Sequence, residues 1–238
     1  MILQGGFNYY GIPLGVISLE SLFPKPEGHI KYAASFDFPV LYRTVKGATV
    51  DRLIRERDPE LLEPFIEAAR ELEREGVHAI TGSCGFLALH QQQIADAVKV
   101  PVFMSSLLQV PLVSRMLGGG RKVGVVVANS EALSADHLRG AGIADEPLAI
   151  GGMQDQPQFA DVILHGHRND LDMDVFSSEL CSVVERMLTD NPTVGAIVLE
   201  CTDLSHFAPE LHQRFGLPVF DLTSLTRMVA GAVHRTRA

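Results

Sequence analysis

Two stretches decide the fold of this chain: VHAITGSCGFLA at residues 77–88 and VGAIVLECTDLS at residues 194–205. In each stretch an apolar run leads into a short turn that carries a cysteine. The two cysteines lie 117 positions apart, and the same ungapped shift lays PVF at residues 101–103 on PVF at residues 218–220. Any two α/β units share a general strand–turn–helix pattern, but that pattern alone would not keep one register over about 30 residues. We therefore interpret the pair as an internal repeat.

The repeat divides the chain into two similar α/β half-domains, residues 1–118 and 119–238. Apolar runs such as LGVIS at residues 14–18 and KVGVVVA at residues 122–128 alternate with amphipathic helices. Continuous apolar strands separated by helices indicate a mainly parallel sheet covered on both faces. The sequence therefore predicts an α/β fold with a cleft between the halves, and we expect the terminal helices to be exchanged between them.

Local signals mark one helix and one break in the chain. Asp58 and Pro59 are typical of a helix start, and Gly76 is typical of a helix end. Gly118, Gly119 and Gly120 are consecutive, and glycine is favourable in turns but unfavourable inside helices. This triplet predicts a turn or hinge between the two halves.

Composition excludes several classes of protein. The formal net charge is -9 with no stripe of Lys and Arg, which argues against nucleic-acid binding and against an anionic membrane surface. No apolar run is long enough to span a bilayer. The N-terminal residues lack a signal-peptide pattern, so we expect a cytoplasmic protein. There are three cysteines and no CxxC pair, which leaves structural zinc without support.

Cys84 and Cys201 each follow an apolar strand and precede a helix. Ligands bind at this carboxyl end of the strands in open α/β sheets. Free N–H groups at a helix start favour a thiolate and bind carboxylates, so we expect both thiols to have pKa values lowered toward neutrality. Two thiols on opposite sides of a cleft suit the removal of a proton from one face of a stereocentre and its delivery to the other. That chemistry requires no metal or cofactor, and we expect none.

This two-cysteine arrangement resembles the aspartate/glutamate racemase superfamily, which also contains hydantoin racemases, maleate cis–trans isomerases and arylmalonate decarboxylases. Cys201-Thr202-Asp203 is similar to the superfamily's second motif. Three departures are present. Gly85-Phe86 stands where amino-acid racemases have Asn-Thr, Ser18-Leu19-Glu20 replaces an Asp-Ser pair, and Glu200 replaces the usual glycine.

The resemblance implies a set of site residues. Cys84 and Cys201 are the expected catalytic pair, and Asp203 either assists Cys201 or caps the next helix. The expected substrate contacts are the residues that follow the strands: Ser18, Gly85, Phe86, Ser105, Ser106, Asn129 and Thr202.

We therefore predict a cofactor-independent racemase of an aspartate- or glutamate-type amino acid. The alternatives are a hydantoin racemase, a maleate-type isomerase, or a non-catalytic two-lobed binding protein with inert cysteines. The expected partner is a small substrate that bears a carboxylate, and the resemblance implies a homodimer.

Several other residues receive structural interpretations. Cys181 is expected to fill the core along an amphipathic helix, and His165 with His167 is expected in a surface loop rather than a metal site. Glu200 is expected to point to the opposite face of the strand from Cys201. Residues 153–167 are expected to cover the cleft.

Overall fold

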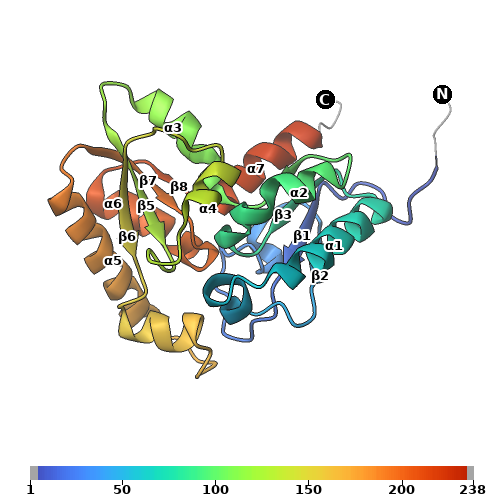
Figure 1. The fold of residues 1–238 in the computed structure, drawn as a ribbon, viewed down its shortest axis with the longest axis horizontal. Helices are drawn as coiled ribbons and strands as arrows, with labels where there is room; N and C mark the ends of the chain where they lie inside the picture. The colour runs from blue at the N-terminus through green and yellow to red at the C-terminus, as the bar shows by residue number, and fades with distance from the viewer. Residues whose placement is uncertain (1–4, 235–238) are drawn as a thin grey trace.

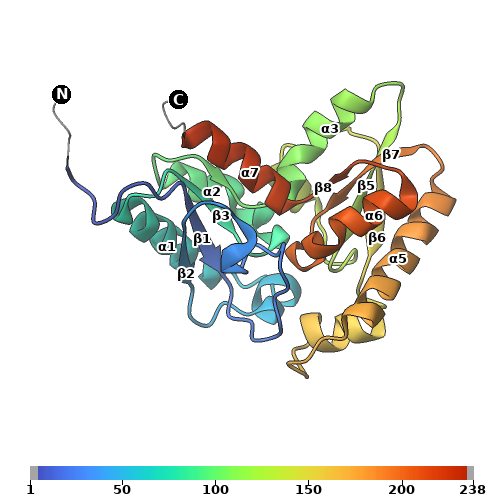
Figure 2. The same cartoon turned by 180° about the vertical axis from the view of Figure 1, so that it is seen from behind.

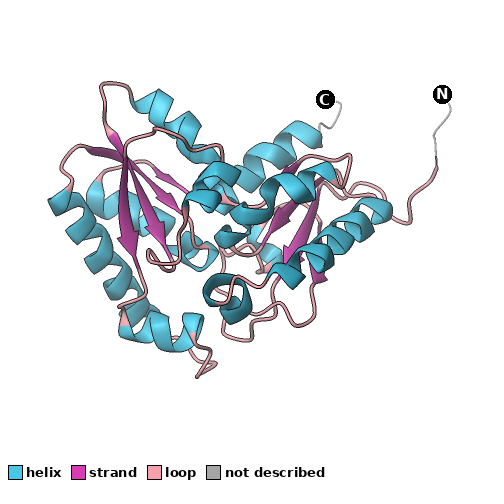
Figure 3. Cartoon of the chain, in the orientation of Figure 1, coloured by secondary structure: helices cyan, strands magenta, loops and turns pink. Residues whose placement is uncertain are grey.

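The computed structural model describes residues 5–234. The predicted half-domains extend beyond this range at residues 1–4 and 235–238. Each half contains one four-stranded parallel sheet flanked by helices (Figures 1 and 3). The predicted α/β class is confirmed.

The first sheet has the strand order β2-β1-β3-β4 and the second has the order β6-β5-β7-β8, so the two sheets share one topology. The strands of the first are β1 (Leu14–Ser18), β2 (Val40–Thr44), β3 (Ala79–Gly82) and β4 (Val102–Phe103). Those of the second are β5 (Lys122–Val127), β6 (Leu148–Gly152), β7 (Val194–Leu199) and β8 (Val219–Phe220). The central strands β1, β3, β5 and β7 are almost wholly buried, as their unbroken apolar sequences require.

Seven α-helices lie around the sheets in the described part of the chain (Figure 2). They are α1 (Leu62–Glu75), α2 (Gln91–Asp96), α3 (Val110–Leu117), α4 (Ala135–Gly140), α5 (Met173–Asp190), α6 (Ala208–Phe215) and α7 (Leu222–Val233). Short 3₁₀ turns are η1 (Ala33–Ser35), η3 (Pro59–Leu61), η4 (Gly85–His90), η5 (Ser106–Gln109) and η7 (Thr202–Phe207). Two single turns of π-helix complete the set, η2 (Asp51–Arg55) and η6 (Phe159–Leu164).

The predicted helix signals around α1 are confirmed. The Asp58 carboxylate accepts a hydrogen bond from the Glu60 N–H at the start of the 3₁₀ turn that precedes α1. Gly76 ends α1 in the left-handed conformation at φ 98°. Gly118, Gly119 and Gly120 all have positive φ, between 59° and 69°, which explains why glycine occupies the turn between the sheets.

Helix α7 is the element that crosses between the halves. It follows β8 in the chain, yet its Leu222 and Leu225 pack in one apolar cluster with Leu14 and Val16 of β1 (Figure 1). A hydrogen bond also joins the two halves: Ser106 Oγ, in η5, donates to the carbonyl of Leu199, at the end of β7, at 2.7 Å. Among the described residues, no helix is both long and apolar enough to cross a bilayer.

Candidate functional site

A cavity lies between the two sheets, beyond the ends of β1, β3 and β7. About 420 Å³ of space that no atom fills lies within it, open solvent included. Its lining comes from the loop after β1, the two cysteine turns and the two π-helical turns: Leu19, Ser21, Phe23, Lys25, His29, Lys31, Val50, Ile54, Ser83, Cys84, Gly85, Phe86, Ala128, Ile163, Leu164, Glu200, Cys201, Thr202 and Asp203.

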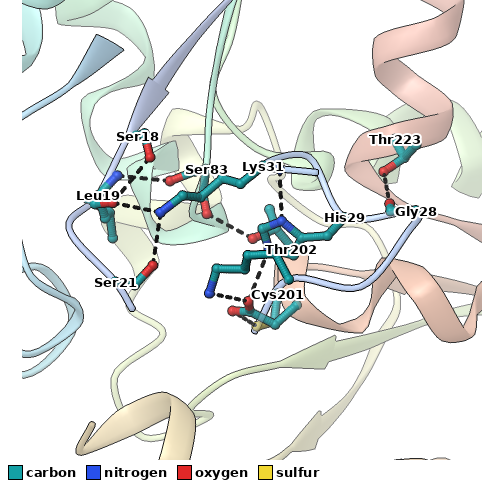
Figure 4. Close-up of polar contacts among 12 residues, drawn as sticks. Ser18, Leu19, Ser21, Gly28, His29, Lys31, Ser83, Cys201, Thr202 and Thr223 are labelled. Atoms are coloured by element: carbon teal, nitrogen blue, oxygen red, sulfur yellow. Dashed lines mark hydrogen bonds and ion pairs between the residues drawn. The ribbon is translucent and has the colours of Figure 1, made fainter. Parts of the chain in front are cut away.

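Six of the ten predicted site residues line this cavity: Cys84, Gly85, Phe86, Cys201, Thr202 and Asp203. The internal repeat therefore brings the two cysteine turns to one cavity, although Cys84 and Cys201 lie in different sheets' connections. Thr202 Oγ1 donates to the Ser83 carbonyl at 2.8 Å and ties the two turns together (Figure 4).

The other four predicted substrate contacts are not among the residues that line this cavity. Ser18 Oγ donates to the Leu19 carbonyl, and Ser105 Oγ accepts from the Leu107 N–H at the start of a 3₁₀ turn. Ser106 Oγ donates to the Leu199 carbonyl across the junction, and Asn129 Oδ1 accepts hydrogen bonds from the N–H groups of Glu131 and Ala132 in the turn that follows it. A polar atom of each of the four side chains thus bonds to backbone groups of the protein itself.

The electrostatics of the two thiols also differ from expectation. The Phe86 N–H and the Asp203 N–H are directed at the sulfurs of Cys84 and Cys201, and each lowers the thiol pKa. Burial outweighs them, and it holds the pKa of both thiols above the ordinary value of cysteine. The segments after the cysteines begin as six-residue 3₁₀ turns rather than as α-helices. Few peptide dipoles therefore align toward each thiol, and the expected helix-dipole stabilisation of a thiolate is small. The prediction that both thiols have lowered pKa values is therefore wrong.

Asp203 lies beside the Cys201 thiol, with 3.6 Å between Sγ and Oδ2. Burial alone would raise the pKa of this carboxyl group. The charge of Lys25, whose Nζ is 3.4 Å from Oδ1, and a hydrogen bond from His29 reverse that effect and hold the pKa well below its usual range. Asp203 is therefore a carboxylate that accepts from the thiol.

His29 has a defined tautomer in this cluster. The Lys31 N–H donates to His29 Nδ1 at 2.8 Å, so Nδ1 carries no proton and Nε2 carries one (Figure 4). The Nε2–H then donates to Asp203 Oδ1 at 3.0 Å. Burial lowers the pKa of His29, which keeps the ring neutral, and it lowers the pKa of Lys25 to about 8. The cluster holds one carboxylate against one ammonium ion.

Lys31 extends from the same loop into the cavity. Its ammonium group donates to the Leu19 carbonyl at 2.9 Å and to Ser21 Oγ at 3.0 Å (Figure 4). Sequence reasoning missed Lys25, His29 and Lys31, because FPKPEGHIK at residues 23–31 has the composition of an ordinary polar loop. The only available signal was three basic side chains within seven positions directly after a buried strand.

Glu200 also lines the cavity, contrary to the expected orientation. β7 ends at Leu199, so the alternation of side chains along a strand no longer applies at position 200. Its side chain is fully buried, and Oε2 accepts from the Ala128 N–H at 3.3 Å. Gly85 makes room for it, since a Cβ at that position would overlap both the carbonyl and Oε1 of Glu200.

The remaining interpretations concern residues outside the cysteine turns. Cys181 is buried in the core as expected, and His165 and His167 are exposed. Ile163 and Leu164, from the segment expected to cover the cleft, line the cavity. Within residues 5–234, no three His, Cys, Asp or Glu side chains are grouped as metal ligands.

Comparison with known proteins gives relatives in sequence and in structure. Dimethylsulfoniopropionate lyase 7 of Emiliania huxleyi (strain CCMP1516) is 31% identical over 233 residues, which cover 94% of this chain and 68% of the relative. The dimethylsulfoniopropionate lyase of Durusdinium sp. clade D is 30% identical over 232 residues, covering 94% of this chain and 76% of the relative. For lyase 3 of the same E. huxleyi strain, the chain spans only 61% of the relative's length. No family model matches the chain.

Solved structures with the same fold belong to the superfamily expected from the cysteine motifs. Unliganded arylmalonate decarboxylase has a TM-score of 0.56 at 16% identity and covers 94% of this chain and 95% of its own. Glutamate racemase from Francisella tularensis with D-glutamate has a TM-score of 0.58 at 15% identity, with coverages of 95% and 85%. Allantoin racemase from Klebsiella pneumoniae has a TM-score of 0.60 at 16% identity, with coverages of 93% and 87%. The expected resemblance is confirmed in fold.

The prediction of an amino-acid racemase is wrong. The curated relatives that match most of the chain at about 30% identity are lyases. The physical reason for the error is that a thiol can serve as a general base in more than one class of reaction. The two cysteine motifs therefore do not distinguish a racemase from a lyase, whereas the residues around them differ from those of amino-acid racemases.

Proposed function

We propose, because this chain belongs to the family of the dimethylsulfoniopropionate lyases, that it cleaves dimethylsulfoniopropionate into dimethyl sulfide and acrylate. The family is one of enzymes, and the chain spans 68% of the first of these relatives. One structural observation carries the proposal to this chain: the thiol of Cys201, with the Asp203 carboxylate beside it, lines a small cavity that also contains two lysines.

The proposed reaction is a β-elimination. A base removes the proton from C2, next to the carboxylate, and the electron pair of that C–H bond becomes the C2–C3 double bond. The C3–S bond breaks and its electron pair leaves with sulfur, so the sulfonium cation becomes neutral dimethyl sulfide. The proton remains on the base. The atoms and electrons balance with a base alone, and we propose catalysis without a cofactor.

We assign the base to Cys201. Its sulfur has an anionic hydrogen-bond acceptor in Asp203, which orients the S–H bond. Burial raises the pKa of the thiol, but a bound sulfonium cation favours the thiolate because opposite charges attract. The thiol proton leaves to solvent as the substrate binds, so the sulfur is free to take the C2 proton. The substrate thus promotes the ionisation of the group that attacks it.

The two ends of the substrate have different partners in the lining. The carboxylate has cationic partners in Lys25 and Lys31. The dimethylsulfonium group carries no N–H or O–H donor, so its methyl groups need an apolar surface. Such a surface is available in the lining: Val50, Ile54, Phe86, Ile163 and Leu164. A homodimer and a cytoplasmic location remain predictions.

The decisive experiment incubates the purified protein with dimethylsulfoniopropionate and measures dimethyl sulfide in the headspace and acrylate in solution. Equal amounts of both products are expected. Deuterium at C2 of the substrate should slow the reaction, because the proposed base breaks that bond. Absence of dimethyl sulfide from a folded protein that binds the substrate would refute the proposal.

A further inference from the structure

Glu200 has a buried carboxyl group in which only one of the two oxygens has a hydrogen-bond partner among the described residues. The side chain is 0% exposed, and Oε2 accepts from the Ala128 N–H. Oε1 is buried and has no hydrogen-bond partner among the described residues. Because Glu200 lines the cavity, a ligand in the cavity is the available partner for this oxygen.

The surroundings of Glu200 favour the neutral acid. No Lys, Arg or His within residues 5–234 forms an ion pair with it. The titratable groups that interact with it electrostatically are Cys84, Cys201 and Asp203, all of which become or are anionic. Burial raises the pKa of Glu200 to about 8, so the group is protonated at neutral pH. Since Oε2 accepts an N–H, the proton belongs on Oε1.

We propose that Glu200 is a further catalytic residue, a neutral carboxylic acid whose Oε1–H donates a hydrogen bond to the carboxylate of the bound substrate. The assignment deepens the proposed lyase function and rests on it only in requiring a substrate that bears a carboxylate. Oε1 has no hydrogen-bond partner among the described residues, and a substrate carboxylate provides one.

The hydrogen bond would contribute to rate as well as to binding. When the C2 proton leaves, negative charge spreads onto the substrate carboxylate, and a preorganised donor in a buried site stabilises that charge more than it stabilises the ground state. A carboxylic acid kept neutral by an apolar site is a known way to supply such a donor. An ionised Glu200 would instead repel both the carboxylate and the Cys201 thiolate.

Proton linkage tests the assignment without turnover. Acrylate, the proposed product, is titrated into the protein at pH 8 by calorimetry in buffers of different ionisation enthalpy. Binding should take up a proton at Glu200, about half an equivalent if its pKa is near 8, and Glu200→Gln should lose this uptake. Acrylamide, which has the same shape without the carboxylate charge, is the ligand control.

Lys25 is the group most able to imitate this signal, because its pKa is also lowered to about 8. Lys25→Arg therefore serves as the matched variant, because a guanidinium keeps the positive charge beside the ligand and does not lose its proton near pH 8. It should keep the uptake that Glu200→Gln loses, and if uptake survives in Glu200→Gln and disappears in Lys25→Arg, the assignment is overturned. Failure of the wild-type protein to bind acrylate would overturn it too.

A pair of substitutions separates donation from packing. Glu200→Gln keeps a neutral N–H donor, so its kcat at neutral pH should stay within about tenfold of wild type, and it should lose any fall in rate that accompanies Glu200 ionisation. Glu200→Met removes the donor and should lower kcat by about 10²–10³-fold. Equal rates for the two folded variants would contradict the role.

The proposed function and this inference can fail separately. A protein that shows the Glu200-dependent proton uptake with acrylate but releases no dimethyl sulfide would refute the lyase proposal alone. A protein that releases dimethyl sulfide while Glu200→Met keeps the wild-type kcat would refute the role of Glu200 alone.

Discussion

The two cysteine turns, Ser83-Cys84-Gly85-Phe86 and Glu200-Cys201-Thr202-Asp203, follow a similar backbone course but differ in their side-chain chemistry. Each cysteine is extended, follows a buried parallel strand and starts a six-residue 3₁₀ turn. Each sulfur receives the N–H two residues onward. At the flanking positions, however, the first turn presents a serine and a phenylalanine where the second presents two carboxyl groups.

This difference is consistent with the proposed elimination, in which the two thiols have unequal roles. A racemase must exchange the roles of acid and base with direction, which two equivalent groups do best. An elimination that releases a neutral sulfide needs one base, so the environments of the two thiols are free to diverge. The carboxyl groups of Glu200 and Asp203 both belong to the second turn, and we therefore expect the second turn to carry most of the chemistry.

The largest expected effect separates the two thiols. Cys201→Ala should lower kcat for dimethyl sulfide release by about 10²–10⁴-fold, the usual contribution of a general base. Cys84→Ala should cost less than about tenfold, because no step in the proposed elimination requires a second base. Steady-state rates of both purified variants provide the comparison, and equal losses would restore a two-base mechanism.

A smaller effect is expected from the partner of Cys201. Asp203→Asn should lower kcat by about 10- to 100-fold, since the thiol loses its orienting carboxylate. The same change should lower the pKa of Cys201, because the negative charge of Asp203 is one of the causes that raise it. In a Cys84→Ala background, alkylation of the thiol by iodoacetamide at pH 8 should therefore become faster. Unchanged alkylation kinetics would argue that Asp203 does not act on the thiol.

The buried acid of the second turn should also affect stability. Burial raises the pKa of Glu200 from its model-peptide value of 4.5 to about 8, so the folded state binds a proton that the unfolded state releases between these values. The resulting stabilisation is complete below pH 4.5 and is lost as pH rises toward 8.

Glu200→Gln removes this linkage. Relative to wild type, its free energy of unfolding should rise with pH by at most about 1.4 kcal/mol per unit. Urea unfolding of both proteins at pH 5, 6.5 and 8 measures the difference, and a constant difference across this range would show that Glu200 is ionised when folded.

The smallest expected effects compare the positions that follow the two cysteines. Gly85→Ala introduces a Cβ that overlaps Glu200, and it should reduce the free energy of unfolding by about 1–3 kcal/mol. At the equivalent position, Thr202→Ala loses only the hydrogen bond to the Ser83 carbonyl and should cost about 1 kcal/mol. Denaturant unfolding measures both. A Gly85→Ala variant as stable as wild type would contradict the close packing of the two turns.

Much of the fold follows from local pattern. A few neighbouring residues suffice to predict each of three features: the buried strands β1, β3, β5 and β7, the ends of the α1 segment at Asp58 and Gly76, and the glycine turn at 118–120. The repeat added the expectation that the two cysteine turns form one site, and both turns line one cavity. The sequence did not distinguish serines that bond to backbone groups of the protein, such as Ser105 and Ser106, from serines that face a ligand.

The sequence by itself determined an α/β chain with two related sheets and a cysteine after a central strand in each, because side-chain periodicity and helix ends are encoded locally. Only the tertiary structure decided which groups surround those thiols. His29 reaches Asp203 across 174 positions, and Gly85 makes room for Glu200 across the junction of the halves. Burial and Coulomb interactions depend on such distant neighbours, so the protonation of Cys201, Asp203 and Glu200 could not be derived from the residues next to them in the chain.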